Sequence, residues 1–319
     1  MSVTHPGGVQ DLTPLWAGEG FPADVRTALQ TTTDVATHST PVVVARRVSP
    51  GARALLSESG VSWADEAGAL ELTAGTIFIR TPGNPSDARM TPPQRFTAAA
   101  GAMAEILLQR AAEGDQRVPT VAELADAVGA SRGAASRALT FFDMQGWTSN
   151  LGPQRGPTAR RELTERGAML DAWGAWHAAG DDTVVHAHAV IRDADVWLSD
   201  VVARHWPAGA WAATGLVGLE RRAPFATTTN PIDVYLDATA YDDDLDALLQ
   251  VAGLTRTDSG IRVRILRGDR YVLRQASTTS TDSPYPLVSD VRLYGDLLRR
   301  GGVRADEFAM HLREIRIGF

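Results

Sequence analysis

The segment of residues 118–161 constrains the fold of this chain more than any other. Thr120 can cap a short helix, and Glu123 three residues later completes a T-x-x-E capping box. Gly129 can take the left-handed conformation that ends this helix, and Ser131 can cap a second helix directly after it. Two short helices joined by such a turn are typical of a helix-turn-helix, whose second helix enters the DNA major groove.

Apolar positions support both predicted helices. Leu124 and Val128 in the first helix lie four residues apart and therefore share a face. The second helix has an apolar stripe in which small alanines allow a close crossing of the two helices. This stripe consists of Ala135, Ala138, Leu139 and Phe142.

The outward side of the second helix carries residues suited to DNA. Arg132 and Arg137 can each clamp a guanine edge or a phosphate, and Ser136 is short enough for the helix to seat deeply. A hairpin wing is expected next, with strands at 147–151 and 158–163 around a Gly/Pro turn. The predicted DNA-binding residues are Ser131, Arg132, Gly133, Ser136, Arg137, Arg155 near the wing tip, Arg160 and Arg161.

Charge supports the same interpretation. Residues 131–161 contain five arginines and one acid, Asp143, a local balance of +4 in a chain whose net charge is −7. A basic island in an acidic protein indicates a nucleic-acid site. The alternative is a winged helix used only for protein–protein contacts, but such modules usually lack outward arginines.

Composition excludes several classes of protein. The 319 residues suffice for two or three domains, cysteine is absent, and the 31 basic residues are all arginine. A disulfide framework and a thiolate metal site are therefore excluded. No apolar run approaches the roughly 18 residues of a membrane span, and the N-terminus lacks the features of a signal peptide. A cytoplasmic location is expected.

An N-terminal α/β domain is predicted for residues 1–92, with the first 20 residues loosely ordered. A helix at 22–29, a buried strand at 41–48 and a helix from Pro50 to Gly60, capped by Ser49, come first. Three short strands follow, at 61–63, 69–72 and 76–80, so a small mixed sheet is expected.

A restriction-type nuclease in this first domain is the enzymatic alternative. Asp65 and Glu71 could supply the two acids of its metal site, but Thr73 stands where the motif needs a lysine. A relic of that fold or a purely structural domain is therefore expected rather than an active nuclease.

A polar, Pro-rich linker at 81–94 leads into the winged helix-turn-helix domain, predicted at 93–178. Its first helix spans 95–110, and a helix from Glu162 onward carries Met169, Leu170, Trp173 and Trp176 on one side. The last part, 179–319, is predicted to be an α+β domain. Its expected strands are 183–191, 232–236, 261–265 and 271–274, and its expected helices are 195–205, 211–221, 242–252, 285–300 and 305–315.

Two features of the last domain could carry chemistry. His186 and His188 share a strand face and could bind zinc, but a solvated strand face is the simpler interpretation. Asp233 and Asp237 suggest a degenerate nucleotidyltransferase, yet four residues separate them, too far for one two-metal centre. We expect no catalytic residue, no metal site and no cofactor.

Six segments in fixed order carry a family resemblance over residues 40–319. The chain resembles the AbiEi family of antitoxin-type transcriptional regulators from type IV toxin–antitoxin systems. One departure is Ala69, where relatives of this length tend to have asparagine. The segments are GVSWADEAGALEL, LADAVGASRGAASRAL, AMLDAWGAW, AATGLVGLERRAPF, NPIDVYLDA and SPYPLVSDVRLYGDLLRRGG with EFAMHLRE.

The resemblance implies a winged helix that represses its own promoter and a C-terminal part with the antitoxin role. It assigns the DNA role to Ser131, Arg132, Ser136, Arg137 and the wing arginines. The expected partner is double-stranded operator DNA; a cognate toxin or its target and a second copy of the chain are further candidates, and no membrane is expected. The alternatives are a nucleic-acid-processing enzyme, nuclease or nucleotidyltransferase, and a stand-alone regulator that responds to a small molecule.

Overall fold

The computed structural model describes residues 2–5, 8–30, 39–75, 77–82, 96–151, 160–226, 228–276, 283–301 and 304–319. It is a mixed α+β protein with two main mixed β-sheets, and at this level the expected α+β class is confirmed. Two compact units are distinguished, one of residues 1–95 with 139–149 and one of residues 96–138 with 150–319. The three-domain division remains a prediction.

A six-stranded sheet forms the first unit, with its strands in chain order. β3 is parallel to both of its neighbours, whereas the other pairs are antiparallel, so the predicted mixed sheet is confirmed. The strands are β1 (Ser2–His5), β2 (Gly8–Trp16), β3 (Thr40–Ala45), β4 (Ser62–Asp65), β5 (Ala69–Ala74) and β6 (Ile77–Pro82).

The expectation of loose order before residue 20 is wrong. β1 and β2 form a hairpin, and β2 then pairs with β3 from Leu12 opposite Thr40 to Trp16 opposite Val44. The polar, Gly- and Pro-containing composition hides these strands, because β2 is ordered by pairing with β3 beyond α1, and β1 by pairing with β2, rather than by an alternating apolar pattern.

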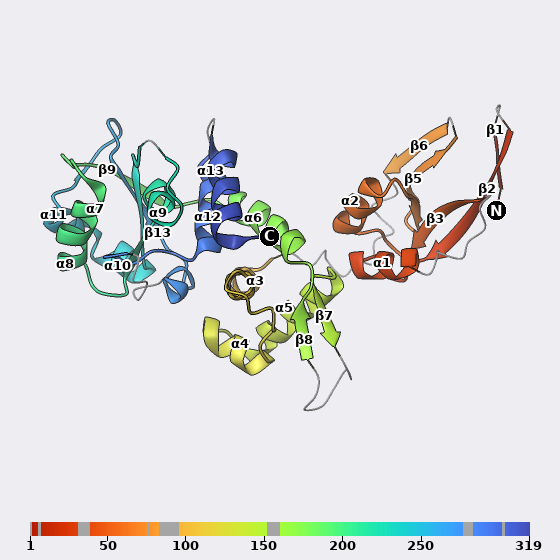
Figure 1. The fold of residues 1–319 in the computed structure, drawn as a ribbon, viewed down its shortest axis with the longest axis horizontal. Coiled ribbons are helices and arrows are strands. Elements are labelled where there is room, and N and C mark those ends of the chain that lie inside the picture. Colours follow the sequence, from red (N-terminus) through yellow and green to blue (C-terminus); the bar gives the residue numbers. More distant parts are fainter. Residues whose placement is uncertain are drawn as a thin grey trace. The chain divides into compact units, whose positions relative to one another are not determined.

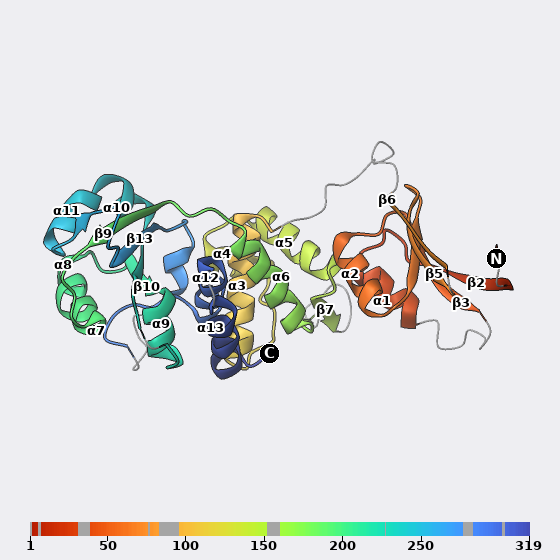
Figure 2. The ribbon, with the colours of Figure 1, turned by 90° about the horizontal axis from the view of Figure 1, so that it is seen from above.

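Two predicted helices of the first unit are confirmed, α1 (Pro22–Gln30) and α2 (Pro50–Glu58). Ser49 caps α2, since its Oγ accepts a hydrogen bond from the backbone N–H of Ala52 at 3.3 Å. Both helices lie on one face of the sheet (Figure 2). The core between them includes Val25, Val43, Leu56 and Trp63.

The second unit contains a five-stranded sheet in the order β10-β11-β13-β9-β12. β11 and β13 are parallel, and the other pairs are antiparallel. The strands are β9 (Val184–His188), β10 (Trp211–Thr214), β11 (Ile232–Leu236), β12 (Thr255–Arg256) and β13 (Val263–Arg267).

Several predicted elements of the second unit are wrong in type or extent. Residues 211–221 were expected to be one helix, but Trp211–Thr214 is strand β10 and α9 (Gly215–Arg222) follows it. All four strand residues are buried, and such a short apolar run has no period that distinguishes strand from helix. The helix expected at 242–252 is divided between α10 (Ala238–Asp243) and α11 (Leu245–Val251).

The strand expected at 271–274 is a 3-10 helix, η4 (Val272–Gln275). Asp269 explains the difference, because its Oδ1 accepts hydrogen bonds from the backbone N–H groups of Tyr271 and Val272, at 2.7 and 2.9 Å. An aspartate that binds the N–H groups two and three residues later favours a turn over an extended strand.

The helix expected from Glu162 onward begins later, as α6 (Arg166–Ala178), because strand β8 (Arg160–Leu163) occupies the preceding residues. The other predicted helices of the C-terminal part are present. They are α7 (Ala194–Trp197), η3 (Leu198–Val202), α8 (Ala203–His205), α12 (Asp290–Arg300), α13 (Ala305–Leu312) and η5 (Arg313–Ile317).

A helical layer joins the C-terminal sheet to the predicted DNA-binding part within the second unit. α12 packs against α6, α9, α13 and α3 (Ala98–Ala112), and α3 also contacts α6 (Figure 1). Trp173 is fully buried on α6, and its indole N–H donates to the carbonyl of Gly101 on α3 at 2.9 Å. Within the described ranges, no helix has both the length and the apolar character of a membrane span.

Candidate nucleic-acid interface

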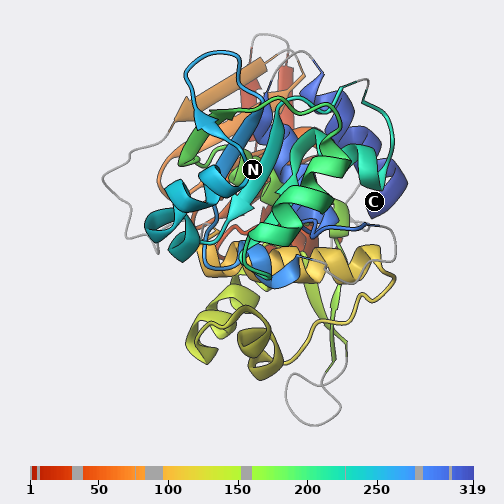
Figure 3. The same ribbon diagram turned by 90° about the vertical axis from the view of Figure 1, so that its left-hand side faces the viewer.

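The first helix of the predicted helix-turn-helix is α4 (Val121–Val128), which lies against α3 (Figure 3). Thr120 Oγ1 accepts from the N–H of Glu123 at 3.3 Å, and the Glu123 carboxylate accepts from the N–H of Thr120 at 2.8 Å. This reciprocal pair confirms the predicted capping box. The hydrogen bonds from Thr120 also hold the pKa of the Glu123 carboxyl below its usual value.

The turn after α4 depends on Gly129. Its φ of +65° is left-handed, as predicted for the residue that ends this helix. Ser131 then begins α5 (Arg132–Met144), since its Oγ accepts from the N–H of Ala134 at 3.2 Å. The expected apolar stripe of α5 is buried, with Ala135, Ala138, Leu139 and Phe142 each no more than 4% exposed.

The outward residues of α5 are all exposed, as the sequence predicts: Ser131, Arg132, Gly133, Ser136 and Arg137. A Cβ at Gly133 would lie 3.4 Å from Nη1 of Arg137, so this arginine leans back along the helix over the glycine. Neither Arg132 nor Arg137 forms a hydrogen bond or ion pair with another described residue. Two exposed guanidinium groups are thus available to an external partner.

The predicted wing is present as two paired strands, β7 (Thr148–Leu151) and β8. Residues 116–118 extend this small sheet, because the N–H of Val118 donates to the carbonyl of Arg161 at 2.9 Å. Arg160 is exposed, whereas Arg161 is half-buried and has interactions of its own, so β8 presents the two arginines differently. The expected wing tip, with Arg155, lies outside the described residues.

Two arginines that sequence reasoning missed contact the turn of the helix-turn-helix. Arg270 donates through Nη2 to the carbonyl oxygen of Gly129 at 2.8 Å, and its guanidinium stacks over Tyr271. The guanidinium of Arg274 lies so close to Gly129 that a Cβ there would be 2.5 Å from Nη2. Because more than 140 residues separate the partners, no local pattern could have indicated this contact.

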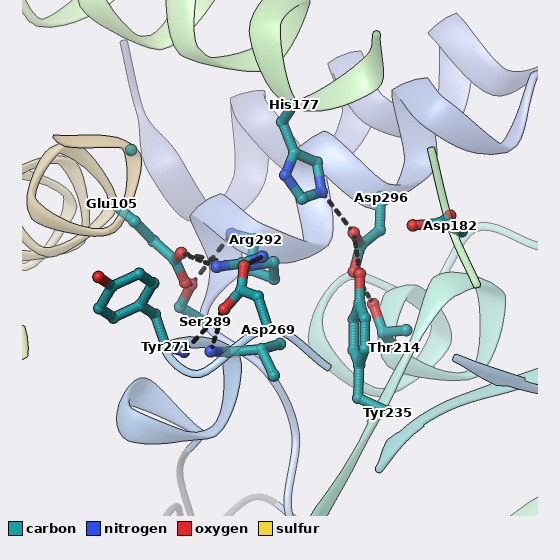
Figure 4. Close-up of polar contacts among 12 residues, drawn as sticks. Glu105, His177, Asp182, Thr214, Tyr235, Asp269, Tyr271, Ser289, Arg292 and Asp296 are labelled. Atoms are coloured by element: carbon teal, nitrogen blue, oxygen red, sulfur yellow. Dashed lines mark hydrogen bonds and ion pairs between the residues drawn. The ribbon is translucent and has the colours of Figure 1, made fainter. Parts of the chain in front are cut away.

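A buried ion pair fixes α3 behind the helix-turn-helix. Arg292 on α12 donates to Oε2 of Glu105 from Nε at 3.0 Å and from Nη2 at 2.6 Å, and its Nη1 contacts Asp269 at 3.3 Å (Figure 4). Ser289 donates to the other Glu105 oxygen at 2.7 Å. Burial alone would lower the pKa of Arg292, but the charges of Glu105 and Asp269 raise it above its usual range.

A second buried polar cluster centres on Asp296 of α12. His177, Thr214 and Tyr235 converge on its carboxylate, at 2.7, 2.6 and 2.8 Å (Figure 4). Burial lowers the pKa of His177, which keeps its imidazole neutral. Burial raises the pKa of Asp296, but the hydrogen bonds from His177 and Thr214 and the charge of Arg292 lower it on balance.

Acid should therefore destabilise the protein through His177. Its folded pKa lies below the ordinary value of 6.5, so below pH 6.5 the unfolded chain binds a proton that the folded chain does not. The free energy of unfolding should fall with a slope approaching about 1.4 kcal/mol per pH unit for this one proton. Urea titrations between pH 7.5 and 5.0 measure it. The slope should be smaller in His177→Gln and unchanged in His186→Gln, and equal slopes in both variants would contradict the prediction.

The acids considered for a nuclease have structural partners. The buried carboxylate of Asp65 accepts from the N–H of Ala69 at 2.9 Å and lies 3.7 Å from Arg53. Glu71 lies 3.4 Å from Arg80 on the neighbouring strand. These contacts tie the strands and helix of the first unit together.

The acids considered in the C-terminal part are likewise engaged, and so is His188. Asp233 is buried and receives two hydrogen bonds of 2.6 Å from Arg264 and one of 2.9 Å from Arg300. Asp237 caps α10 by accepting from Ala240, and His188 bonds the carbonyl of Gly260. Among the described residues there is no group of three or more histidines and acids that could hold a metal ion.

No protein-family model matches the chain, and comparison with curated proteins and with solved structures finds no significant similarity. The resemblance to the AbiEi family therefore stays a prediction.

Proposed function

We propose that the protein is a sequence-specific, double-stranded DNA-binding transcription regulator without catalytic activity. One observation carries the proposal: Arg132 and Arg137 project, exposed and without an ion pair to another described residue, from the first turns of α5 in a helix-turn-helix. An acidic protein gains little from exposed arginines at this place unless they meet an anionic partner. Phosphates and guanine edges are the groups that arginines in this position bind.

The resemblance to AbiEi-type antitoxins supports a narrower form of this proposal. In that form the protein represses its own promoter, and its C-terminal part acts on a cognate toxin or the target of that toxin. The contact of Arg270 and Arg274 with Gly129 gives the C-terminal part a direct connection to the helix-turn-helix. The operator is then expected among sequences directly upstream of the coding region.

Binding should depend strongly on salt. If the five arginines of residues 131–161 meet phosphates or bases, log affinity should fall against log salt with a slope of about −3 to −5 for one winged helix. Fluorescence anisotropy with the protein's own upstream DNA, from about 50 to 300 mM NaCl, measures this slope. A slope near zero, or no binding at 50 mM salt, would show that the island does not bind DNA.

The two arginines of α5 should contribute differently to DNA binding, one to specificity and the other to general affinity. They lie five residues apart and so point to different sides of the helix. Arg137→Ala should cost about 1–3 kcal/mol on the operator and little on scrambled duplex, because it lies along the predicted groove-facing side. Arg132→Ala, beside the Ser131 cap, should weaken binding to both DNAs.

Titration of both variants against operator and scrambled duplex at one fixed salt concentration tests this division. Both side chains are exposed, so thermal unfolding should remain close to that of the wild type. Equal losses on the two DNAs for Arg137→Ala would mean that specificity resides elsewhere.

A further inference from the structure

A polar cavity of about 340 Å³ lies at the N-terminal end of α12 in the second unit. Residues from α3, α9, η4, α12 and η5 meet there. Its size is at the lower end of the range for small-molecule sites, so it could hold only a small ligand. The lining residues are Gln109, Ala112, Glu113, Arg222, Gln275, Ser289, Asp290 and Arg316.

The chemistry of the cavity depends on Arg222. Its side chain is only 10% exposed, and it makes no hydrogen bond to any residue in the described part of the chain. Its one charged contact is with Asp290, where Nε and Oδ1 lie 3.4 Å apart and neither atom has a hydrogen-bond partner. A buried Nε–H without a hydrogen-bond partner is energetically costly, so an acceptor beside Arg222 would be stabilising.

Positive groups surround the carboxylate of Asp290, although the two arginines and two acids of the lining balance in formal charge. Arg316 also approaches Asp290, with Nε 3.3 Å from Oδ2, so two guanidinium groups share one carboxylate. The eleven-residue helix α12 adds the partial positive charge of its N-terminus. Glu113, the other acid, is exposed, and its carboxylate already accepts from Gln109 at 2.9 Å.

We propose that this cavity binds a small oxyanion, the carboxylate or phosphate group of a metabolite. Arg222 is its anchor and Arg316 the second cation, since guanidinium groups bind carboxylates and phosphates through paired hydrogen bonds. Gln109 of α3 forms one wall, and its Oε1 accepts from the N–H of Asp290 at 3.0 Å, so an occupant contacts the helix that lies behind α4. Anion binding is independent of the proposed DNA function.

Thermal unfolding of the full chain at pH 7 tests the proposal, in sodium chloride, sodium phosphate and sodium succinate of equal ionic strength. At a concentration about ten times the dissociation constant, phosphate or succinate should raise the Tm of the wild type by about 2–4 °C. Arg222→Gln should abolish the increase, while Arg204→Gln, an exposed arginine paired with Asp200 outside the cavity, should retain it.

The comparison between variants is decisive, because phosphate also stabilises proteins by exclusion from their surface. The proposal would be overturned if the Tm rose equally in the wild type and in Arg222→Gln, or if neither phosphate nor succinate raised the Tm of the wild type. A rise in Tm with phosphate alone, or with succinate alone, identifies the group that the site accepts. If Arg222→Gln does not fold, Arg316→Gln decides, and isothermal titration should then show at least a several-fold weaker affinity for the preferred anion than in the wild type.

Discussion

Replacing Arg292 by methionine should lower the free energy of unfolding by about 3–5 kcal/mol, because the change leaves a buried carboxylate without its cation. The Glu105 side chain is 1% exposed and the Arg292 side chain 6% exposed, so water cannot replace the lost partner. Ser289 would remain as a donor, but one neutral hydroxyl compensates little for a guanidinium that bonds the same carboxylate twice. Urea unfolding of the full chain at pH 7 measures the loss.

Two controls distinguish this buried pair from ordinary arginine contacts. Arg204→Ala removes an exposed ion pair with Asp200 and should change stability by no more than about 0.5 kcal/mol. The double variant Glu105→Leu with Arg292→Met should recover much of the loss, because an apolar pair leaves no uncompensated charge. If Arg292→Met costs no more than Arg204→Ala, the pair does not stabilise the junction between α3 and α12.

The two helices of the predicted helix-turn-helix and the turn between them were predicted correctly, because their determinants are local. The capping box joins residues three apart, Gly129 ends α4 within the same segment, and the stripe of α5 repeats at helical spacing. The sequence alone therefore predicts where α4 ends, where α5 begins and which face of α5 is buried. The exposure of Arg132 and Arg137 follows from the same periodicity.

What the sequence could not show depends on partners far apart in the chain. Strand β10 is a strand because it pairs with β11, and the pattern of Trp211–Thr214 alone does not distinguish it from a helix. Arg270 and Arg274 reach Gly129 across more than 140 residues, and Arg292 meets Glu105 across 187. An arginine has the same appearance in sequence whether it binds DNA, a buried glutamate or a backbone carbonyl.

The same limitation applies to Asp296, an acid that sequence analysis had no reason to select. Its side chain is 8% exposed and receives hydrogen bonds from three elements of the second unit: His177 on α6, Thr214 on β10 and Tyr235 on β11. The neutral imidazole donates through Nε2, an assignment that follows from its carboxylate partner. Asp296 thus connects the helical layer to the C-terminal sheet through one carboxylate.

Asp296→Ala should consequently lower the free energy of unfolding by about 3–5 kcal/mol at pH 7, because three buried donors lose the same charged acceptor. Tyr235→Phe removes only one of these hydrogen bonds and should cost about 1–2 kcal/mol. Asp296→Asn, which keeps one acceptor oxygen but turns an amide donor toward the remaining donors, should lie between them. If the Asp296 carboxylate organises these contacts, urea unfolding of the three variants at pH 7 shows the largest loss for Asp296→Ala and the smallest for Tyr235→Phe. Should Asp296→Ala cost no more than Tyr235→Phe, the three hydrogen bonds do not act together, and the sheet and the helical layer are held by contacts other than those of Asp296, among them the ion pair of Arg300 with Asp233.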